Sequence, residues 1–425
     1  MTTLAGTEQE KVQLRNFAGS EDSCGGPLAG VRVLEISGIG PGPFCGMLLA
    51  DLGADVVRVD RPGGGPWNLI AADRDPLGRN KRSVEVDLKQ PEGVQTVLSL
   101  AAHADILFEG FRPGVAERLG IGPEECWRRR PQLVYGRMTG WGQDGPLRHT
   151  AGHDICYIAP TGALHAIGQA GAPPAIPLNL VGDYGGGSMY LAVGLLAALL
   201  EARTSGKGQV VDAAIVDGAA HLMTAFYGLL ADGGWQDERG ANLIDGGAPF
   251  YGVYETSDGK YLAVGALEPE FYAEFLKRLE LDVPPSSQLD RTGWPRLRQR
   301  IAERIGSAPR HEWLERFGDG DGCVAPVLSL REAPDDPHLA ARGTFLTRFG
   351  VRQPAPAPRF SRTPGTIRRD PEVLGGTAVD DVLTGWATLD RGGSDVPGGG
   401  PADLPARAGA ARSRSDRTDL ERTSS

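Results

Sequence analysis

The chain has 425 residues, with 44 Lys and Arg against 54 Asp and Glu, and its formal net charge is −10. A hydrophobic fraction of 40% can build large cores, so this length predicts two or three domains and excludes a wholly disordered chain. Because the chain is acidic and has no run of more than three Lys or Arg residues, we expect no nucleic acid or anionic membrane as its main partner.

Residues 1–26 are polar and aperiodic, which predicts a flexible extension. Apolar periodicity then predicts, in chain order, strand 31–36, helix 44–52, strand 55–60, strand 84–88, helix 91–102, strand 105–108 and strand 133–138. Alternating strands and helices of this kind predict an α/β fold whose parallel sheet carries helices on both faces.

The pattern changes after residue 140. Residues 189–202 predict a strongly apolar helix, and Ser257-Asp258-Gly259 between two apolar runs predicts a β-hairpin over 251–264. Glu268 then precedes a proline that suits the first turn of a helix. Residues 391–425 lack an apolar face, which predicts a disordered tail.

The five cysteines are odd in number, widely spaced and without a CxxC pair. This argues against a disulfide framework and against a structural zinc site, so we expect no metal. No apolar signal segment opens the chain, and its longest apolar stretch, Met189 to Leu200, is too short to cross a bilayer. We therefore expect a cytoplasmic protein.

The glycine-rich turn after the first strand invites comparison with the dinucleotide fingerprint G-x-G-x-x-G. Counted from Gly38, the third glycine would be residue 43, which is Pro43; counted from Gly40, it would be Cys45. Prolines also remove the amide donors that a pyrophosphate needs. Although Asp60 stands where a ribose-binding acid would, a structural tight turn is favoured over an NAD site.

Basic residues follow several predicted strands, among them Arg61, Lys89 and Arg112. The carboxyl ends of parallel strands meet at one edge of a sheet, where several such side chains could hold a phosphate-bearing ligand. The alternative interpretation is solvated surface charge.

Three further residues are candidates for acid–base chemistry. His153 lies in a polar, glycine-flanked loop and could carry a proton near neutral pH, although from the residues alone a structural histidine is the favoured alternative. Asp183 precedes the apolar helix and Glu268 opens another, so each could equally serve only as a helix cap or first-turn acid. The sequence contains no GxSxG, HExxH or P-loop motif.

Seven segments together resemble the family III CoA-transferase (CaiB/BaiF-type) superfamily, and within it the α-methylacyl-CoA racemase branch. They are GPLAGVRVLEISGIGPGPFCGMLLADLGADVVRVDRPG, FRPGVAERLG, GRMTGWGQDGP, AGHD, NLVGDYGGGS, SGKGQVVDAAIVDG and GAPFYGVYETSDGKYLAVGALEPEFY. The resemblance implies an interlocked homodimer with an active site between subunits. Each subunit would have a Rossmann-like large domain that binds CoA (27–220), a small α+β domain (221–335) and a segment returning to the large domain (336–390).

The resemblance also implies roles for individual residues. His153 and Asp183 match two catalytic bases, Glu268 matches the acid that supports the histidine, and Asp154 stands where transferases of the superfamily keep a nucleophilic aspartate. The positions that match CoA-binding residues are Arg61, Val86, Asp87, Leu88, Lys89, Gly110, Phe111, Arg112, Arg118, Gly152 and Tyr157. Phe111 departs from the family by replacing a tyrosine often found there.

The activity so implied is a racemase or epimerase of fatty acid metabolism, which interconverts (R)- and (S)-2-methylacyl-CoA thioesters through an enolate. Two bases would move the proton, no metal or redox cofactor would be needed, and CoA would be part of the substrate. One alternative is a family III CoA-transferase with Asp154 as nucleophile. Another is a non-catalytic CoA-binding protein.

Overall fold

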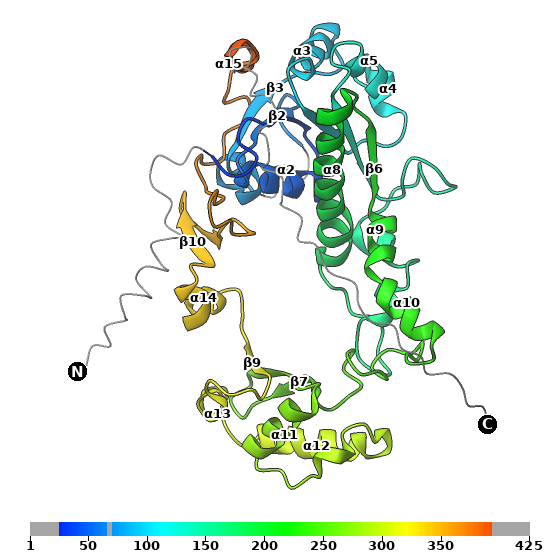
Figure 1. Ribbon diagram of the computed structural model, residues 1–425, viewed down its shortest axis with the longest axis vertical. Coiled ribbons are helices and arrows are strands. Elements are labelled where there is room, and N and C mark those ends of the chain that lie inside the picture. Colours follow the sequence, from blue (N-terminus) through cyan, green and yellow to red (C-terminus); the bar gives the residue numbers. More distant parts are fainter. Residues whose placement is uncertain (1–24, 66–69, 393–425) are drawn as a thin grey trace, which may run out of the picture.

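The computed structural model describes residues 25–65 and 70–392 (Figure 1). The flexible extension expected at 1–26 and the disordered tail expected at 391–425 therefore lie almost entirely outside the described residues.

A six-stranded parallel sheet in the order β3-β2-β1-β4-β5-β6 is the centre of the molecule's larger part. Its strands are β1 (Arg32–Ile36), β2 (Asp55–Asp60), β3 (Lys81–Glu85), β4 (Ile106–Glu109), β5 (Val134–Thr139) and β6 (Val210–Ala214). The predicted α/β fold with a parallel sheet is thereby confirmed.

Two strands differ from the prediction. The strand expected at 84–88 is β3 at 81–85, because Lys81 pairs with Val56 of β2 and its ammonium group is neutralised inside the protein by Glu35, 2.7 Å away. Because β3 begins with the charged residue Lys81, its first residues were not recognised as part of a strand. The sixth strand, β6, was not predicted at all; it pairs in parallel with β5 and forms one edge of the sheet.

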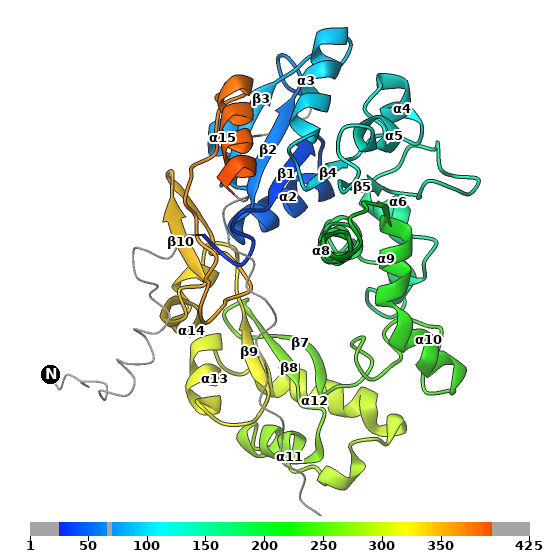
Figure 2. The ribbon, with the colours of Figure 1, turned by 45° about the horizontal axis from the view of Figure 1, so that its top comes forward.

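Helices cover both faces of this sheet, as predicted (Figure 2). On one face, α2 (Pro41–Asp51) and α8 (Met189–Ser205) pack on strand residues such as Val33 and Ile106. On the other, α3 (Pro91–Ala101), α4 (Val115–Leu119), α5 (Pro123–Trp127) and α15 (Val379–Gly392) pack on neighbours such as Leu34 and Leu107. Successive strand residues point to opposite faces, so each strand contributes to both cores.

The helix α8 continues a π-helical segment, Leu180–Ser188, without a break. The combined helix, Leu180–Ser205, is the one helix among the described residues that is long and apolar enough to cross a membrane. It is longer than the uninterrupted apolar stretch seen in the sequence. Half of its most apolar window is buried in the chain, and core helices meet the same criterion, so its length is weak evidence for a membrane span.

A smaller sheet has its own core in the lower part of Figures 1 and 2. Strands β7 (Tyr251–Glu255), β8 (Tyr261–Gly265) and β9 (Val324–Val327) are antiparallel, and β7 and β8 form the predicted hairpin. They pack with α11 (Pro269–Arg278), α12 (Trp294–Ile305) and α13 (Arg310–Phe317) around buried aromatic residues that include Phe250 and Trp313. The segment α9 (Ile215–Leu222) and α10 (Thr224–Ala231) leads to it from the large sheet.

The chain then returns to the large sheet through α14 (Pro337–Ala341) and a hairpin of β10 (Phe345–Arg348) and β11 (Val351–Pro354). Buried Arg79, bound to Asp51, donates from Nη1 to Gln353 Oε1 and to the Pro354 carbonyl oxygen, both at 2.8 Å. Asn80 donates to the Thr366 carbonyl oxygen at 2.8 Å. These bonds fix the returning segment beside α2 and β3.

Candidate active site

The strand order reverses between β1 and β4, the point at which open α/β sheets bind ligands outside their strand carboxyl ends. Three cavities adjoin there, and Ile39 in the turn after β1 lines all of them. We call them the rim cavity (about 470 Å³), the central cavity (about 570 Å³) and the side cavity (about 420 Å³).

The rim cavity collects predicted residues that follow β2, β3 and β4. It is lined by Arg61, Val86, Asp87, Leu88, Lys89, Gly110 and Phe111, together with apolar residues of β1, β2 and β5. Within the described ranges, Arg61 and Lys89 form no ion pair with a carboxylate, so their charges are available to an anionic ligand. Apolar walls with cationic edges suit a ligand that has both a phosphate and an apolar part.

Arg118 is the one predicted member of the CoA-binding set that lines none of the three cavities. It lies in α4, and its Nη1 is close to Gly114 at the start of that helix. The neighbouring helix residue Glu117 is bonded to Arg137 of β5, which holds α4 against the sheet. In this structure Arg118 is therefore outside the cleft.

The central cavity brings His153 and Asp183 together, with Gly152, Tyr157 and Arg112 in the same wall. His153 has extended backbone and caps the short helix α6 (Asp154–Ile158). The Tyr157 hydroxyl donates to the Gly152 carbonyl oxygen, and its ring packs edge-on against Trp141 at 5.0 Å. A Cβ on Gly152 would lie 2.7 Å from that ring, so a glycine is needed for Tyr157 to hold the His153 loop.

Asp183 projects from the π-helical segment, a geometry that often occurs at functional sites. Its Oδ2 lies against Gly40, where a Cβ would be only 2.9 Å away. The side chain of Asn179 donates to the same oxygen at 3.4 Å and lines the central cavity too. Asn179 was missed in the sequence; its position four residues before Asp183, one helical turn away, was the available signal.

Burial raises the pKa of Asp183, and the nearby Asp154 carboxylate adds to the rise, whereas Asn179 and His153 oppose it. A carboxylate with a raised pKa is a stronger base than an exposed one. The site thus places an imidazole and a basic carboxylate beside one cavity.

Asp154, the residue adjacent to His153, points into the protein. It is 8% exposed and lines none of the three cavities. Its Oδ1 accepts a hydrogen bond from the backbone N–H of Asp183 at 2.6 Å, while its buried Oδ2 has no partner among the described residues. In this arrangement Asp154 supports the backbone of Asp183 and does not face a ligand.

Glu268 is not brought to His153 within one chain. It caps α11, which lies with the small sheet, away from α8 and α9 in both views (Figures 1 and 2). Among the described residues no hydrogen bond or ion pair joins it to His153 or Asp183, and its charge acts instead on the neighbouring Cys323, whose pKa it helps to raise.

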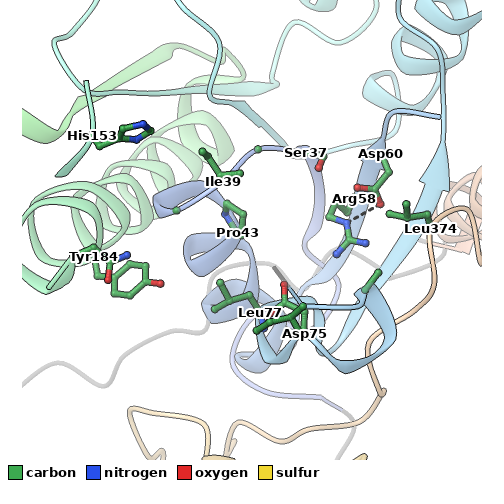
Figure 3. A pocket seen from close by; sticks show the side chains of 15 residues that line it. Ser37, Ile39, Pro43, Arg58, Asp60, Asp75, Leu77, His153, Tyr184 and Leu374 are labelled. Carbon is green, nitrogen blue, oxygen red and sulfur yellow. Dashed lines mark hydrogen bonds and ion pairs between the residues drawn. The ribbon is translucent and has the colours of Figure 1, made fainter. Parts of the chain in front are cut away.

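The side cavity reaches from His153 across the turn after β1 (Figure 3). Tyr184, stacked on Phe44 at 4.6 Å, and the side chains of Ile39, Pro43 and Leu77 give it apolar walls. Its far end holds Arg58, whose Nε donates to Asp60 at 2.7 Å.

Asp60 is also bonded to the Ser83 hydroxyl at 2.7 Å, so it is already engaged and poorly placed to bind a ribose. This agrees with a structural role for the turn after β1. In the described part of the chain, no group of three or more His, Cys, Asp and Glu residues could hold a metal ion.

The sequence profile of CoA-transferase family III matches residues 28–377. The chain is 44% identical over 350 residues to the α-methylacyl-CoA racemase of Mus musculus, an alignment that covers 81% of this chain and 90% of that protein. The chain is 42% identical over 362 residues to the α-methylacyl-CoA racemase of Homo sapiens, and this alignment covers 84% of this chain and 92% of that protein. The alpha subunit of succinyl-CoA–L-malate CoA-transferase from Chloroflexus aurantiacus is 31% identical over 382 residues, covering 84% and 88%.

Solved structures show the same architecture. A CaiB/BaiF family protein from Brucella suis superposes with a TM-score of 0.72 at 25% identity, covering 86% of this chain and all of that one. Rv3272 from Mycobacterium tuberculosis superposes with a TM-score of 0.69 at 27% identity, covering 83% and 98%.

Proposed function

Because the chain belongs to CoA-transferase family III, we propose that its cleft binds an acyl-CoA thioester and interconverts (R)- and (S)-2-methylacyl-CoA. The observation that carries this proposal is that His153 and Asp183 line one cavity beside the cationic rim cavity. The relatives at 42–44% identity are named racemases, whereas the transferase subunit is 31% identical.

CoA would lie along the strand ends. Arg61 and Lys89 would neutralise phosphate charge in the rim cavity, and Arg112 would do so in the adjoining central cavity. The thioester would then reach the central cavity, with its acyl chain directed toward the apolar side cavity that His153 also borders.

The proposed chemistry needs two proton carriers. A thioester acidifies its α-proton because the carbanion delocalises onto the thioester oxygen as an enolate. One base, His153 or Asp183, removes the proton; the C–H electron pair passes to the enolate, and the conjugate acid of the other base delivers a proton to the opposite face. The raised pKa of Asp183 favours this exchange, and no step requires a metal or redox cofactor.

The enolate oxygen needs hydrogen-bond donors. The first N–H groups of a helix have no partner within that helix, and those of α6 begin at Asp154, next to His153. A donor of this kind is worth about 3 kcal/mol in comparable sites. In this proposal the backbone N–H of Asp154 donates to the enolate oxygen, while the Asp154 carboxylate stays buried.

The homodimer is part of the proposal. Helices α8, α9 and α10 expose large apolar side chains, including Val193 and Leu200, which are 64% and 68% exposed. Several large apolar side chains exposed on neighbouring helices are expected where a subunit interface lies. A second subunit could also supply Glu268 to orient and charge-stabilise His153, a contact that a single chain does not make.

The transferase alternative requires Asp154 to attack the thioester carbonyl, and a carboxylate that is 8% exposed and points away from the cavity is poorly placed for that attack. A non-catalytic CoA-binding protein would have no need for His153 and Asp183 in one cavity.

The test is incubation of the wild-type protein with (R)-2-methylacyl-CoA in heavy water without any added acid. The proposal predicts conversion to a near-equal mixture of enantiomers, each carrying deuterium at Cα. Transfer of CoA to an added carboxylate without α-proton exchange would instead support the transferase.

A further inference from the structure

Glu109 is a buried carboxyl group beside the cleft that the proposed chemistry does not use. It is the last residue of β4, next to the point where the strand order reverses, and it is 3% exposed. It lines none of the three cavities, but the two residues after it do: Gly110 and Phe111 line both the rim and the central cavity.

Glu109 controls the backbone of that segment directly. Its Oε2 accepts a hydrogen bond from the N–H of Phe111 at 2.6 Å, and such a bond is stronger when the acceptor is ionised. The bond ties the backbone of Phe111 to the last residue of β4. Phe111 in turn packs on the core beneath α3 and α4, and Arg112 follows into the central cavity.

The charges around Glu109 come from three other elements. Arg137 of β5 is its register partner, but it donates to Gln143 at 2.7 Å and to Glu117 of α4, and makes no bond to Glu109. Glu117 and Asp212 of β6 add negative charge. Burial raises the pKa of Glu109 to about 7; the Phe111 N–H and Arg137 oppose the rise, and the two acids add to it.

We propose that Glu109 is a positioning residue for CoA, whose ionised carboxylate fixes the Gly110–Arg112 segment against the bound ligand. Protonation removes the charge assistance from the bond to Phe111, so the segment loosens and CoA binds more weakly. Glu109 touches no reacting atom, so the turnover number is not affected. The inference rests on the proposed CoA site but not on the racemase chemistry.

The experiment measures binding of dephospho-CoA to the wild-type protein and to Glu109→Gln between about pH 6 and about pH 8.5 by calorimetry. This ligand lacks the 3′-phosphate, whose second pKa of about 6 would otherwise obscure the profile. All other titrating groups are shared by the two proteins, so the difference between their profiles belongs to Glu109. We expect wild-type affinity to fall, by at most about tenfold per pH unit, as the pH drops below about 7.

Glu109→Gln should bind dephospho-CoA with the weaker affinity over the whole pH range. Its affinity should not change near pH 7, where the wild-type curve has its inflection. With a racemisable substrate, its KM should be raised and its kcat retained. The matched control, Glu117→Gln, leaves the Phe111 bond in place but removes a negative charge that raises the pKa of Glu109. Its binding should therefore still depend on pH, with the midpoint at a lower pH than in the wild type. A Glu109→Gln protein that keeps the wild-type profile would overturn the proposal. Absence of CoA binding in every protein would contradict the proposed CoA site instead.

If Glu109→Gln does not fold, a titration of the wild-type protein alone still tests the proposal. With ¹³C-labelled glutamate, one carboxyl should titrate near pH 7, and dephospho-CoA should lower its midpoint, because a ligand that prefers the ionised form stabilises it. A midpoint that does not move on binding would contradict the coupling.

Discussion

Asp154 illustrates how one side chain can be adjacent to a proposed catalytic group and still act through the backbone. Its Oδ1 holds the N–H of Asp183, and Gly182 leaves the space for it, since a Cβ there would lie 2.3 Å from that oxygen. Its identity in the sequence suggested a nucleophile as one alternative. Only its orientation, which depends on contacts 29 residues away in the chain, favours a supporting role.

Two substitutions of Asp154 should separate these roles. Asp154→Asn keeps an oxygen that can accept from Asp183, so we expect racemisation to fall by less than about tenfold. Asp154→Ala leaves a buried N–H without a partner, which costs about 1–3 kcal/mol and should displace Asp183. The measurement is kcat/KM of both variants; a complete loss in Asp154→Asn, with an acyl-enzyme trapped by hydroxylamine in the wild type, would contradict the supporting role.

Glu109 makes a second residue-scale prediction, for stability. Its folded-state pKa of about 7 lies above the ordinary carboxyl value of 4.5, so the folded protein binds more protons than the unfolded chain between those values. Its contribution is therefore fully present below about pH 4.5 and is lost as the pH rises through about 7.

The lost contribution is on the order of 3 kcal/mol, since each pKa unit corresponds to about 1.4 kcal/mol. In urea unfolding from about pH 5 to about pH 8, wild-type stability should fall relative to Glu109→Gln. Parallel pH profiles for the two proteins would show that Glu109 titrates normally.

At the scale of elements, backbone contact between two helices places Asp183. The π-helical segment crosses α9 where Gly186 meets Gly218, and a Cβ on Gly218 would lie 1.9 Å from the Gly186 carbonyl oxygen. No side chain separates the two elements, so α9 sets the position of the segment that carries the proposed base.

Gly218→Ala should therefore force the two helices apart. We expect a loss of unfolding free energy above about 3 kcal/mol and a severe loss of activity. The matched control is Gly385→Ala in α15, where a Cβ would meet nothing within 4 Å and where alanine should stabilise the helix by about 0.5–1 kcal/mol. Urea unfolding of both variants tests this; equal stabilities would refute the close-contact argument.

Periodicity identified the buried strands and the strand ends that line the rim cavity, because apolar alternation and strand-end charge are local signals. It misplaced β3, because the buried Lys81 that begins this strand is typical of a surface position unless its partner Glu35 is known. It missed β6, whose first residues are partly exposed at the sheet edge. The spacing of Asn179 to Asp183 was a local signal that went unused, whereas the burial of Asp154 depends on packing against a segment 29 residues away and could not be read from local sequence.

At the scale of the whole molecule, the proposed site is incomplete in one chain. His153 and Asp183 line a cavity at the edge of the large sheet, while Glu268 caps α11, which packs with the small sheet. A two-fold dimer would allow the small sheet of one subunit to complete the cleft of the other, and the same contact would cover the apolar faces of α8 to α10.

This predicts complementation between two inactive variants. Chains with His153→Ala and chains with Glu268→Ala should each lose activity, but their heterodimer contains one site with both residues intact. Random mixing after co-refolding should restore about a quarter of wild-type activity, because half the dimers are mixed and each has one complete site of two. Light scattering should show dimers throughout; a fully active monomer would contradict the shared site.

The central claim is that His153 and Asp183 act on opposite faces of one α-carbon. The most direct test follows the Cα–H signal of each pure enantiomer of 2-methylacyl-CoA by proton NMR in heavy water, using His153→Ala and Asp183→Asn. We predict that neither variant inverts the centre, and that each still exchanges the α-proton of one enantiomer, with opposite preference in the two variants. Exchange of the same enantiomer by both variants, or undiminished inversion by either, would contradict the two-base account.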